Sequence, residues 1–414
     1  MTPAKPVKIL LVPDVIWGED SGAVSARFSV RALKDLGYEV GVFAFPPAGN
    51  TAAGPASQEF VFFPRRRSSV VNHFIGGEVR REFERALAEF RPDHVFFAGA
   101  AIGKPYCFFD ACLAGKIPYA LLFYMNDYYC MRIYAGLADG PCFKCLGGNY
   151  LHGLLNNCQK GTPRLLQFAK AFLSLNRLKG ALHKCHKVIG YSGDQLSLYL
   201  RHGFSPDQCV KSPVHFDKSR VSSAAPSVRG VHFVLCGQST VEKGWHRMAE
   251  VVKLCPEARF KFVFLSEEVA AREIRKYGLL EFVEQGRIEV LTGIKEHSDL
   301  LTLLAGSRGV LVPSYYPTTG EFLLLEALGL GKPVVVFNAG AHKDIIRSGE
   351  NGLAAEIGDV NGYAAHINRL VSDEALYHKL SDGARRSFEE LTSSAALEAS
   401  LRKAFPPPGG GAAR

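Results

Sequence analysis

Long hydrophobic runs are missing from this sequence, because no stretch approaches the ~18–20 uncharged apolar residues that a membrane-spanning helix requires. The first apolar run, residues 9–12, is broken by Pro13 and Asp14 and is too short for the core of a signal peptide. We therefore expect residues 9–12 to form a buried strand and the protein to remain in the cytoplasm.

Recognition motifs for nucleic acids are also missing, since the chain has no basic helix, no zinc-finger spacing and no motif of aromatic and basic residues. Lys and Arg nevertheless exceed Asp and Glu, 49 against 40, which gives a net charge of +9. The densest basic spot is Arg65, Arg66 and Arg67, which we interpret as a solvated loop. The alternative is a patch that binds anionic lipid headgroups or a phosphorylated substrate, with the protein peripheral at the inner face of the membrane. We expect no nucleic-acid partner.

The length and composition predict a soluble protein of two or three domains, with 47% hydrophobic and 21% charged residues. Two series of apolar strands alternating with helical segments run along the chain, over residues 1–212 and 231–405. Residues 213–230 are rich in Ser, Ala, Pro and Gly and predict a linker between the two domains. The tail, residues 406–414, has low complexity and is expected to be disordered.

The alternation predicts parallel sheets with right-handed crossover connections. Predicted strands of the first series are residues 7–12, 38–45, 94–99, 119–124 and 187–192, and predicted helices include 78–90, 163–183 and 193–201. Predicted strands of the second series are residues 231–237, 261–265, 288–291, 309–312 and 333–337. The fold class is therefore α/β, with two doubly wound, Rossmann-like domains. Such sheets bind ligands beyond the carboxyl ends of their strands, so two facing domains would define a cleft.

Two segments of the second series have the composition of an anion-binding site. Residues 237–244 follow a predicted strand and precede a helix; small residues there let backbone amides approach a phosphate, and Lys243 adds a positive charge. Residues 313–328 lead from a strand through a small-residue loop into a helix that begins near Gly320, whose N-terminus would attract a phosphate. Glu326 lies on this helix and would reach a sugar hydroxyl if it faces the cleft; the alternative is a surface glutamate.

These two segments, in this order, resemble the donor-binding region of retaining glycosyltransferases of the GT-B fold, specifically the family 4 type (glycosyl transferases group 1). The resemblance spans the chain and is strongest over residues 231–370. The matching positions of the second series are Gly237, Lys243, Gly244, Pro313, Ser314, Glu326, Ala327, Gly331, Pro333, Val334 and Val335. In the first series, Gly22 resembles part of the glycine-rich loop that lies near the donor phosphates in this family.

The resemblance implies a set of functional residues. The implied donor-binding residues are Gly22, Gly237, Gln238, Lys243, Thr318, Thr319, Gly320, Glu321, Phe322, Leu323 and Glu326. The implied catalytic residues are Lys243, which would stabilise charge on the diphosphate, and Asn126 and Asp127, which stand where many relatives have a His-Asp pair.

Three positions depart from the family pattern. Gln238 replaces an arginine, and its neutral amide can bond a phosphate oxygen but lacks the charged fork of a guanidinium. The first glutamate of the usual Glu-x7-Glu pattern falls on Thr318, so Thr318, Thr319 or Glu321 would substitute for it in recognising the donor sugar. Asn126 cannot act as an acid or base, whereas Asp127 could orient an acceptor hydroxyl.

An insert at about residues 127–160 carries four of the ten cysteines: Cys130, Cys142, Cys145 and Cys158. Four thiolates, two of them in a Cys-x-x-Cys spacing, predict a structural zinc site, in which His152 could replace one ligand. The alternatives are an iron–sulfur cluster, a redox pair or simply buried thiols. A disulfide framework is a poor explanation in the cytoplasm.

The resemblance implies an enzyme of hexosyltransferase type. It would move a sugar, with retention of configuration, from a nucleoside-diphosphate sugar to a hydroxyl of a carbohydrate or lipid-linked acceptor, in polysaccharide or glycolipid assembly. No cofactor is required for transfer, and the absence of an Asp-x-Asp motif means that Mg²⁺ is not implied. One alternative is a nucleotide-sugar epimerase, which would need a base-rich cleft. The other is a non-catalytic carbohydrate- or partner-binding protein of the same fold, which the three departures would support.

Overall fold

The computed structural model describes residues 5–18, 20–46, 61–64, 77–101, 104–132, 134–137, 139–158, 163, 176–222 and 230–407. The chain forms two compact units, each built from separate stretches. The first contains Met1–Ile133, Phe143–Asp217 and Ser394–Arg414, and the second contains Tyr134–Cys142 and Lys218–Ser393. Several predicted features lie outside the described residues: the basic spot at Arg65, Arg66 and Arg67, residues 164–175 of a predicted helix, residues 223–229 of the linker and residues 408–414 of the tail.

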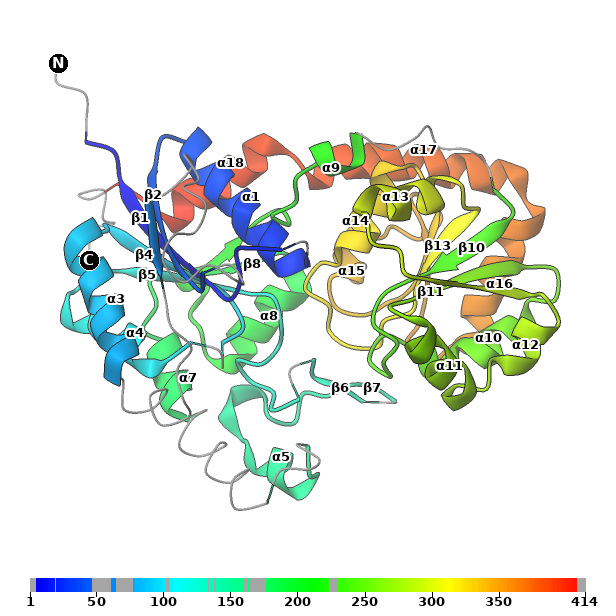
Figure 1. Ribbon diagram of the computed structural model, residues 1–414, viewed down its shortest axis with the longest axis horizontal. Coiled ribbons are helices and arrows are strands. Elements are labelled where there is room, and N and C mark those ends of the chain that lie inside the picture. Colours follow the sequence, from blue (N-terminus) through cyan, green and yellow to red (C-terminus); the bar gives the residue numbers. More distant parts are fainter. Residues whose placement is uncertain are drawn as a thin grey trace. The chain divides into compact units, whose positions relative to one another are not determined.

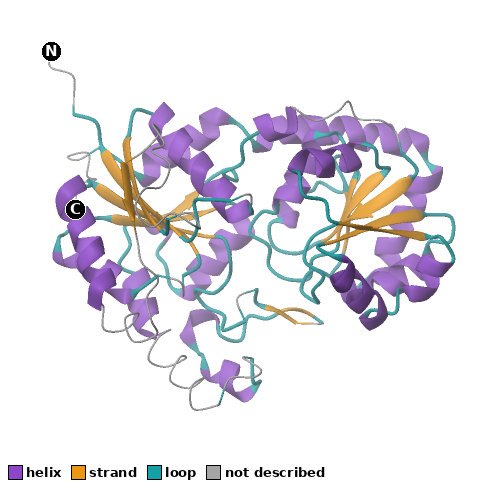
Figure 2. Cartoon of the chain, in the orientation of Figure 1, coloured by secondary structure: helices purple, strands orange, loops and turns teal. Residues whose placement is uncertain are grey.

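The first unit is built on a parallel sheet of seven strands in the order β3-β2-β1-β4-β5-β8-β9. The strands are β1 (Lys8–Pro13), β2 (Glu39–Ala44), β3 (Val61–Pro64), β4 (His94–Gly99), β5 (Tyr119–Phe123), β8 (Lys187–Gly190) and β9 (Cys209–Lys211). The inner strands β4 and β5 are buried along their whole length, because helices cover both faces of the sheet. This arrangement explains their unbroken apolar sequences (Figure 2).

Helices of the first unit have recognisable start and stop signals. They are α1 (Ser21–Asp35), α3 (Gly77–Phe90), α4 (Tyr106–Ala114), α5 (Leu151–Leu155), α7 (Asn176–Leu182), α8 (Gly193–His202) and α18 (Ser394–Ala404), with 3₁₀ turns η1 (Leu146–Gly148) and η3 (Pro206–Gln208). Ser192 caps the start of α8 by accepting a hydrogen bond from the amide of Gln195, and Gly203 ends it with a φ of 110°.

The second unit has a parallel sheet of six strands in the order β12-β11-β10-β13-β14-β15. The strands are β10 (His232–Leu235), β11 (Arg259–Phe264), β12 (Ile288–Thr292), β13 (Gly309–Val312), β14 (Val334–Phe337) and β15 (Leu353–Ala355). Its helices are α9 (Ser219–Ser222), α10 (Met248–Leu254), α11 (Glu267–Lys276), α12 (Leu280–Glu284), α13 (His297–Ala305), α14 (Phe322–Gly329), α15 (His342–Ile345), α16 (Val360–Ser372) and α17 (Glu374–Leu391), with the 3₁₀ turn η4 (Trp245–Arg247). Helices flank both faces of this sheet (Figure 1).

The two strand orders confirm the predicted fold class. Each sheet begins at a central strand, adds two strands on one side and then continues on the other, which is the doubly wound Rossmann arrangement. The predicted strands are confirmed with small shifts at their ends. Short strands at or near sheet edges were not predicted, because a segment such as β9 or β15 has too few residues to show a period of two.

The units differ from the predicted domain boundaries in three places. The sequence pattern predicted one domain from 231 to 405, but α18 and Phe405 lie in the first unit. The Phe405 ring packs on Phe96, with ring centroids 5.1 Å apart, and its carbonyl accepts a hydrogen bond from the hydroxyl of Tyr38 at 2.9 Å. An amphipathic helix shows that one of its faces is buried but not which sheet it covers, so the pattern could not identify this partner.

The second difference is a small antiparallel hairpin in the insert. Its strands are β6 (Gly136–Leu137) and β7 (Gly140–Pro141), and they belong to Tyr134–Cys142, a segment of the second unit. The predicted boundaries placed this segment in the N-terminal domain. Part of the predicted linker also differs, since residues 219–222 form α9.

Among the described residues, no helix is long and apolar enough to cross a membrane.

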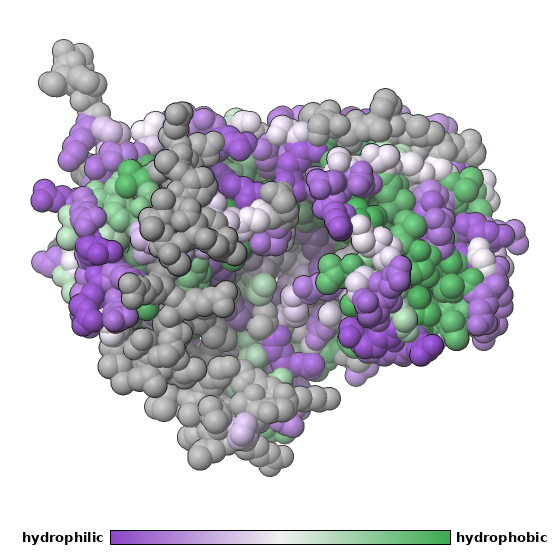
Figure 3. All heavy atoms as spheres, in the orientation of Figure 1, coloured by the Kyte–Doolittle hydropathy of each residue, from purple (hydrophilic) through white to green (hydrophobic). Residues whose placement is uncertain are grey.

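The amphipathic helix α3 has one buried apolar face and one exposed charged face. It buries Val79, Phe83 and Phe90 and exposes Glu78 and Arg80. The purple atoms at the left edge of Figure 3 lie over this helix.

Candidate functional site

The candidate site lies where the strand order of the second sheet changes direction. β10 pairs with β13 on one side, whereas β11, which follows it in the chain, pairs on the other. The loops after β10 and β13, residues 236–244 and 313–321, therefore leave the carboxyl ends of neighbouring strands. Open α/β sheets bind ligands at such a switch point because the loops diverge there. The structure thus brings the two predicted donor-binding segments together.

The two loops are fixed against each other through their backbones. The amide of Tyr315 donates to the carbonyl of Glu242 at 2.8 Å. Gly244 has a φ of +78°, and a Cβ atom there would overlap the carbonyl of Pro313. Only glycine fits this conformation and this close approach, which explains why a glycine follows Lys243.

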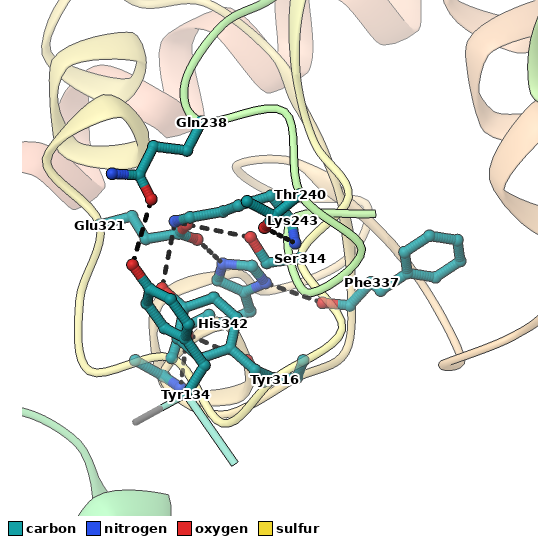
Figure 4. Close-up of polar contacts among 12 residues, drawn as sticks. Tyr134, Gln238, Thr240, Lys243, Ser314, Tyr316, Glu321, Phe337 and His342 are labelled. Atoms are coloured by element: carbon teal, nitrogen blue, oxygen red, sulfur yellow. Dashed lines mark hydrogen bonds and ion pairs between the residues drawn. The ribbon is translucent and has the colours of Figure 1, made fainter. Parts of the chain in front are cut away.

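Lys243 is at the centre of a cluster of polar side chains from both loops (Figure 4). Its ammonium group forms an ion pair with Glu321 and donates a hydrogen bond to the hydroxyl of Tyr316 at 3.1 Å. The other contacts of Glu321 are with Ser314, whose hydroxyl donates at 2.9 Å, and with His342, whose Nε2 lies at 2.7 Å. The carboxylate of Glu321 is therefore surrounded by donors.

His342 connects this cluster to the end of β14. Its Nδ1 lies 2.8 Å from the carbonyl oxygen of Phe337 and its Nε2 lies 2.7 Å from Glu321. Both partners are acceptors, so both ring nitrogens must carry a hydrogen for both bonds to form. Glu321 therefore lies between Lys243 and His342.

The electrostatics of the cluster follow from burial and charge. Burial alone would raise the pKa of Glu321, but the charge of Lys243 and the hydrogen bond from His342 outweigh it and hold that pKa well below its usual range. Burial would lower the pKa of Lys243, but Glu321 and Tyr316 raise it above its ordinary value. Burial raises the pKa of Tyr316 to about 12. Near neutral pH, the cluster therefore contains a carboxylate, an ammonium group and a neutral phenol.

Glu326 is a buried residue of α14, with only 4% of its surface exposed, so the alternative of a surface glutamate is wrong. Its Oε1 lies 2.7 Å from Nε2 of His297, on α13. The side chain of His297 is 26% exposed, against 5% for that of Glu326. Glu326 is also near Cys236, where burial and the charge of Glu326 raise the thiol pKa to about 12.

Thr318 is tied to the turn after β14. Its hydroxyl donates to the carbonyl of Ala339 at 3.2 Å and accepts from the amide of Ala341 at 3.1 Å. Gly340, with a φ of +54°, approaches so closely that a Cβ atom there would overlap the amide of Thr318. The hydroxyl of Thr318 is therefore used within the fold.

The other predicted donor-binding residues border the same two loops. Gly237 and Gln238 are exposed at the start of the first loop, and Thr319 is buried in the second. Gly320 has a φ of +120° and precedes α14, which begins with the partly exposed Phe322 and Leu323. Sequence reasoning missed Tyr316, His342 and His297. Their partners are distant in sequence, as with His342 and Glu321, which are 21 residues apart, so no local pattern identifies them.

The remaining predicted site residues lie in the first unit. The amide of Gly22 donates to the carboxylate of Asp20 at 3.0 Å, so a phosphate could bind this amide only by displacing Asp20. Asn126 and Asp127 follow β5 and are buried, with 0% and 1% of their surfaces exposed. The carbonyl of Asn126 accepts from the amide of Cys130 at 2.9 Å.

The structure does not support the predicted zinc site. All four cysteines are described and none is in a disulfide, yet no group of three or more His, Cys, Asp or Glu side chains among the described residues could hold a metal ion. Cys130 and Cys145 are buried, whereas Cys142 and Cys158 are partly exposed. A spacing in the sequence does not fix the directions of four side chains, so it could not show whether the thiols converge on one point.

Comparison with solved structures identifies the class of fold. The chain is similar to Anabaena Alr3699/HepE in complex with UDP-glucose, with a TM-score of 0.65 and 15% sequence identity, over 96% of this chain and 98% of that one. The likeness covers both sheets, and it identifies the GT-B fold of glycosyltransferases.

Comparison with protein families gives a match that lies within the second unit. Residues 232–387 match the family described as Glycosyl transferases group 1, and this segment contains Lys243, Glu321 and His342. Glycogen synthase from Mycobacterium tuberculosis is 23% identical over 203 residues, which are 48% of this chain and 47% of that protein. The lipopolysaccharide core biosynthesis glycosyltransferase LpsE from Rhizobium meliloti is 28% identical over 163 residues, 39% of this chain and 45% of that protein. The chain thus matches about half the length of these relatives, and residues 232–387 are similar to the glycosyl transferases of group 1.

Proposed function

We propose that this protein is a glycosyltransferase that binds a nucleoside-diphosphate sugar at the loops after β10 and β13 and transfers the sugar, with retention of configuration, to an acceptor hydroxyl. The observation that carries the proposal is the position of Lys243. It lies at the switch point of the second sheet, within the segment that matches the family.

The contacts of Lys243 leave it able to bind a phosphate. An ammonium group has three hydrogens, of which Tyr316 and Glu321 accept two. The side chain is 25% exposed, so the third hydrogen can meet an oxygen of the diphosphate. Charge that builds on the departing diphosphate would then be stabilised by a cation that Glu321 and Tyr316 already hold in place.

The other residues have supporting roles in this proposal. The amide of Gln238 would bond a phosphate oxygen, and Glu326 would act with His297, the more exposed of the two, in binding donor hydroxyls. Transfer with retention needs no protein base, because the departing phosphate can accept the proton of the acceptor hydroxyl. Asp127, which is buried in this structure, would have to become accessible to orient the acceptor.

The names of the relatives suggest the substrates. The Anabaena structure contains UDP-glucose, and the curated relatives include enzymes of glycogen and lipopolysaccharide core synthesis. We therefore propose a UDP-sugar as the donor and a carbohydrate or a lipid-linked saccharide as the acceptor. The net charge of +9 would favour an anionic acceptor or membrane surface.

A thermal-shift screen of the purified protein against UDP, GDP, ADP and dTDP tests the donor class. A nucleotide present at about 100 times its dissociation constant should add ~2.7 kcal/mol to the free energy of unfolding. We expect a rise in Tm with UDP that exceeds the rise with the other three. A larger rise in Tm with another nucleotide would identify that nucleotide, instead of UDP, as the nucleotide of the donor. No rise in Tm with any of the four would contradict the proposed donor site.

A further inference from the structure

The hairpin segment Tyr134–Cys142 packs against the two loops of the candidate site. A Cβ atom on Gly136 would lie 3.0 Å from Cγ of Glu242 and 3.0 Å from Cβ of Tyr316, so glycine allows this close approach. The segment is closed by a hydrogen bond from the amide of Cys142 to the carbonyl of Ala135 at 2.7 Å. The packing places Tyr134 at the edge of the site.

Tyr134 makes two contacts with site residues (Figure 4). Its hydroxyl lies 3.1 Å from Oε1 of Gln238, and its ring packs edge-on against that of Tyr316, with centroids 5.2 Å apart. Tyr316 in turn contacts Lys243 through its hydroxyl and its ring face. Tyr134 therefore touches the residue that replaces the family's arginine and a direct partner of the lysine.

In the structure, Gln238 directs its amide oxygen at the hydroxyl of Tyr134. With the phenol hydroxyl donating to Oε1, Nε2 points to the opposite side, as Figure 4 shows. Within the described part of the chain, Nε2 has no hydrogen-bond partner, and Gln238 is exposed. A carboxamide presents a donor to an anion only in this orientation, because the reversed amide would direct its oxygen at the phosphate.

We propose that Tyr134 is a positioning residue for the nucleotide-sugar donor, which orients the amide of Gln238 so that Nε2 binds the diphosphate. The inference rests on the proposed function, and it assigns a role in donor recognition to the hairpin. A glutamine lacks the charge of an arginine, so a fixed orientation matters more for it. A fixed amide would partly compensate for the missing charge of an arginine.

The test compares binding of UDP and of uridine by calorimetry in wild type and variants. Tyr134→Phe keeps the ring on Tyr316 and removes only the hydroxyl, and we expect the Kd for UDP to rise about three- to tenfold, the effect of one neutral hydrogen bond. The Kd for uridine should not change, because uridine has no phosphate. Gln238→Ala should give a similar rise, and Tyr134→Phe should add nothing in the Gln238→Ala background. If the screen selects GDP or ADP, that nucleotide and its nucleoside replace UDP and uridine.

A matched control is Tyr38→Phe, which removes a phenol hydroxyl that donates to a carbonyl within the first unit. It should leave both dissociation constants unchanged. The positioning role would be overturned if wild type and Tyr134→Phe bound UDP equally well. It would also be overturned if Tyr134→Phe weakened the binding of UDP and of uridine by the same factor, or if it weakened UDP binding further in the Gln238→Ala background. Failure of wild type to bind any nucleotide would instead overturn the proposed function.

Discussion

Replacing Lys243 by methionine is expected to lower kcat/KM for sugar transfer by about 10²–10³-fold, the usual effect of removing a preorganised group that stabilises developing charge. Methionine keeps most of the side-chain volume and removes the ammonium group that contacts Tyr316 and Glu321. The measurement is the rate of nucleoside diphosphate release in the presence of acceptor. Lys253→Met, at an exposed position of α10, provides the matched control and should keep the wild-type rate.

The loss in Lys243→Met has a second explanation that a further variant separates. Without Lys243, the buried carboxylate of Glu321 keeps Ser314 and His342 as its partners among the described residues, and the loss of the cation could distort the site. The double variant Lys243→Met/Glu321→Gln removes both charges. We expect it to remain as inactive as Lys243→Met; recovery of activity in the double variant would contradict a direct role of Lys243.

Replacing Glu321 by glutamine is expected to lower the free energy of unfolding of the second unit by about 2–3 kcal/mol at pH 7. Removing one partner of a fully buried ion pair typically costs about 3–5 kcal/mol, and the partial exposure of Lys243 reduces this cost. The variant leaves Lys243 and His342 close together without the carboxylate between them.

The pH dependence of this difference has a definite sign. The pKa of Glu321 is lower in the folded protein than its ordinary value of 4.5, so the folded state favours the carboxylate. Its stabilising effect is therefore fully present above pH 4.5 and decreases as the pH falls below that value. The difference between wild type and Glu321→Gln should be largest near neutral pH and shrink in acid.

Tryptophan fluorescence can follow the second unit alone. The chain has two tryptophans, and in a Trp17→Phe background only Trp245 remains, buried in the second unit. Guanidinium unfolding at pH 7 and at lower pH would give the two free energies, and Glu284→Gln, at an exposed position, provides the control. Equal stability of Glu321→Gln and wild type at pH 7 would show that the ion pair contributes nothing.

The fold could be predicted from the sequence because its inner strands are buried on both faces. Segments such as β13 and β14 are short, entirely apolar and followed by small residues, a pattern that points to a parallel sheet without further information. The two loops of the candidate site were also recognisable in the sequence, since Gly244, which the backbone geometry requires, directly follows Lys243.

The interior of the site could not be predicted, because its contacts join residues far apart in the chain. Lys243 and Glu321 are 78 residues apart, and Tyr134 and Gln238 are 104 apart. The packing of α18 on the first unit and of the hairpin on the second depends in the same way on tertiary structure. The cysteine spacing was misleading for the same reason, since a spacing in the sequence does not show whether four side chains converge on one point.

Turnover of a nucleotide sugar tests the central claim most directly. Wild-type protein would be incubated with UDP-, GDP-, ADP- and dTDP-sugars and a panel of carbohydrate and lipid-linked acceptors, with detection of released nucleoside diphosphate and of the glycosylated product. We predict acceptor-dependent release from one donor class, a product whose anomeric configuration matches that of the donor, and loss of both signals in Lys243→Met. Binding of a nucleotide without turnover of any donor would contradict the account and favour a non-catalytic binding protein of the same fold.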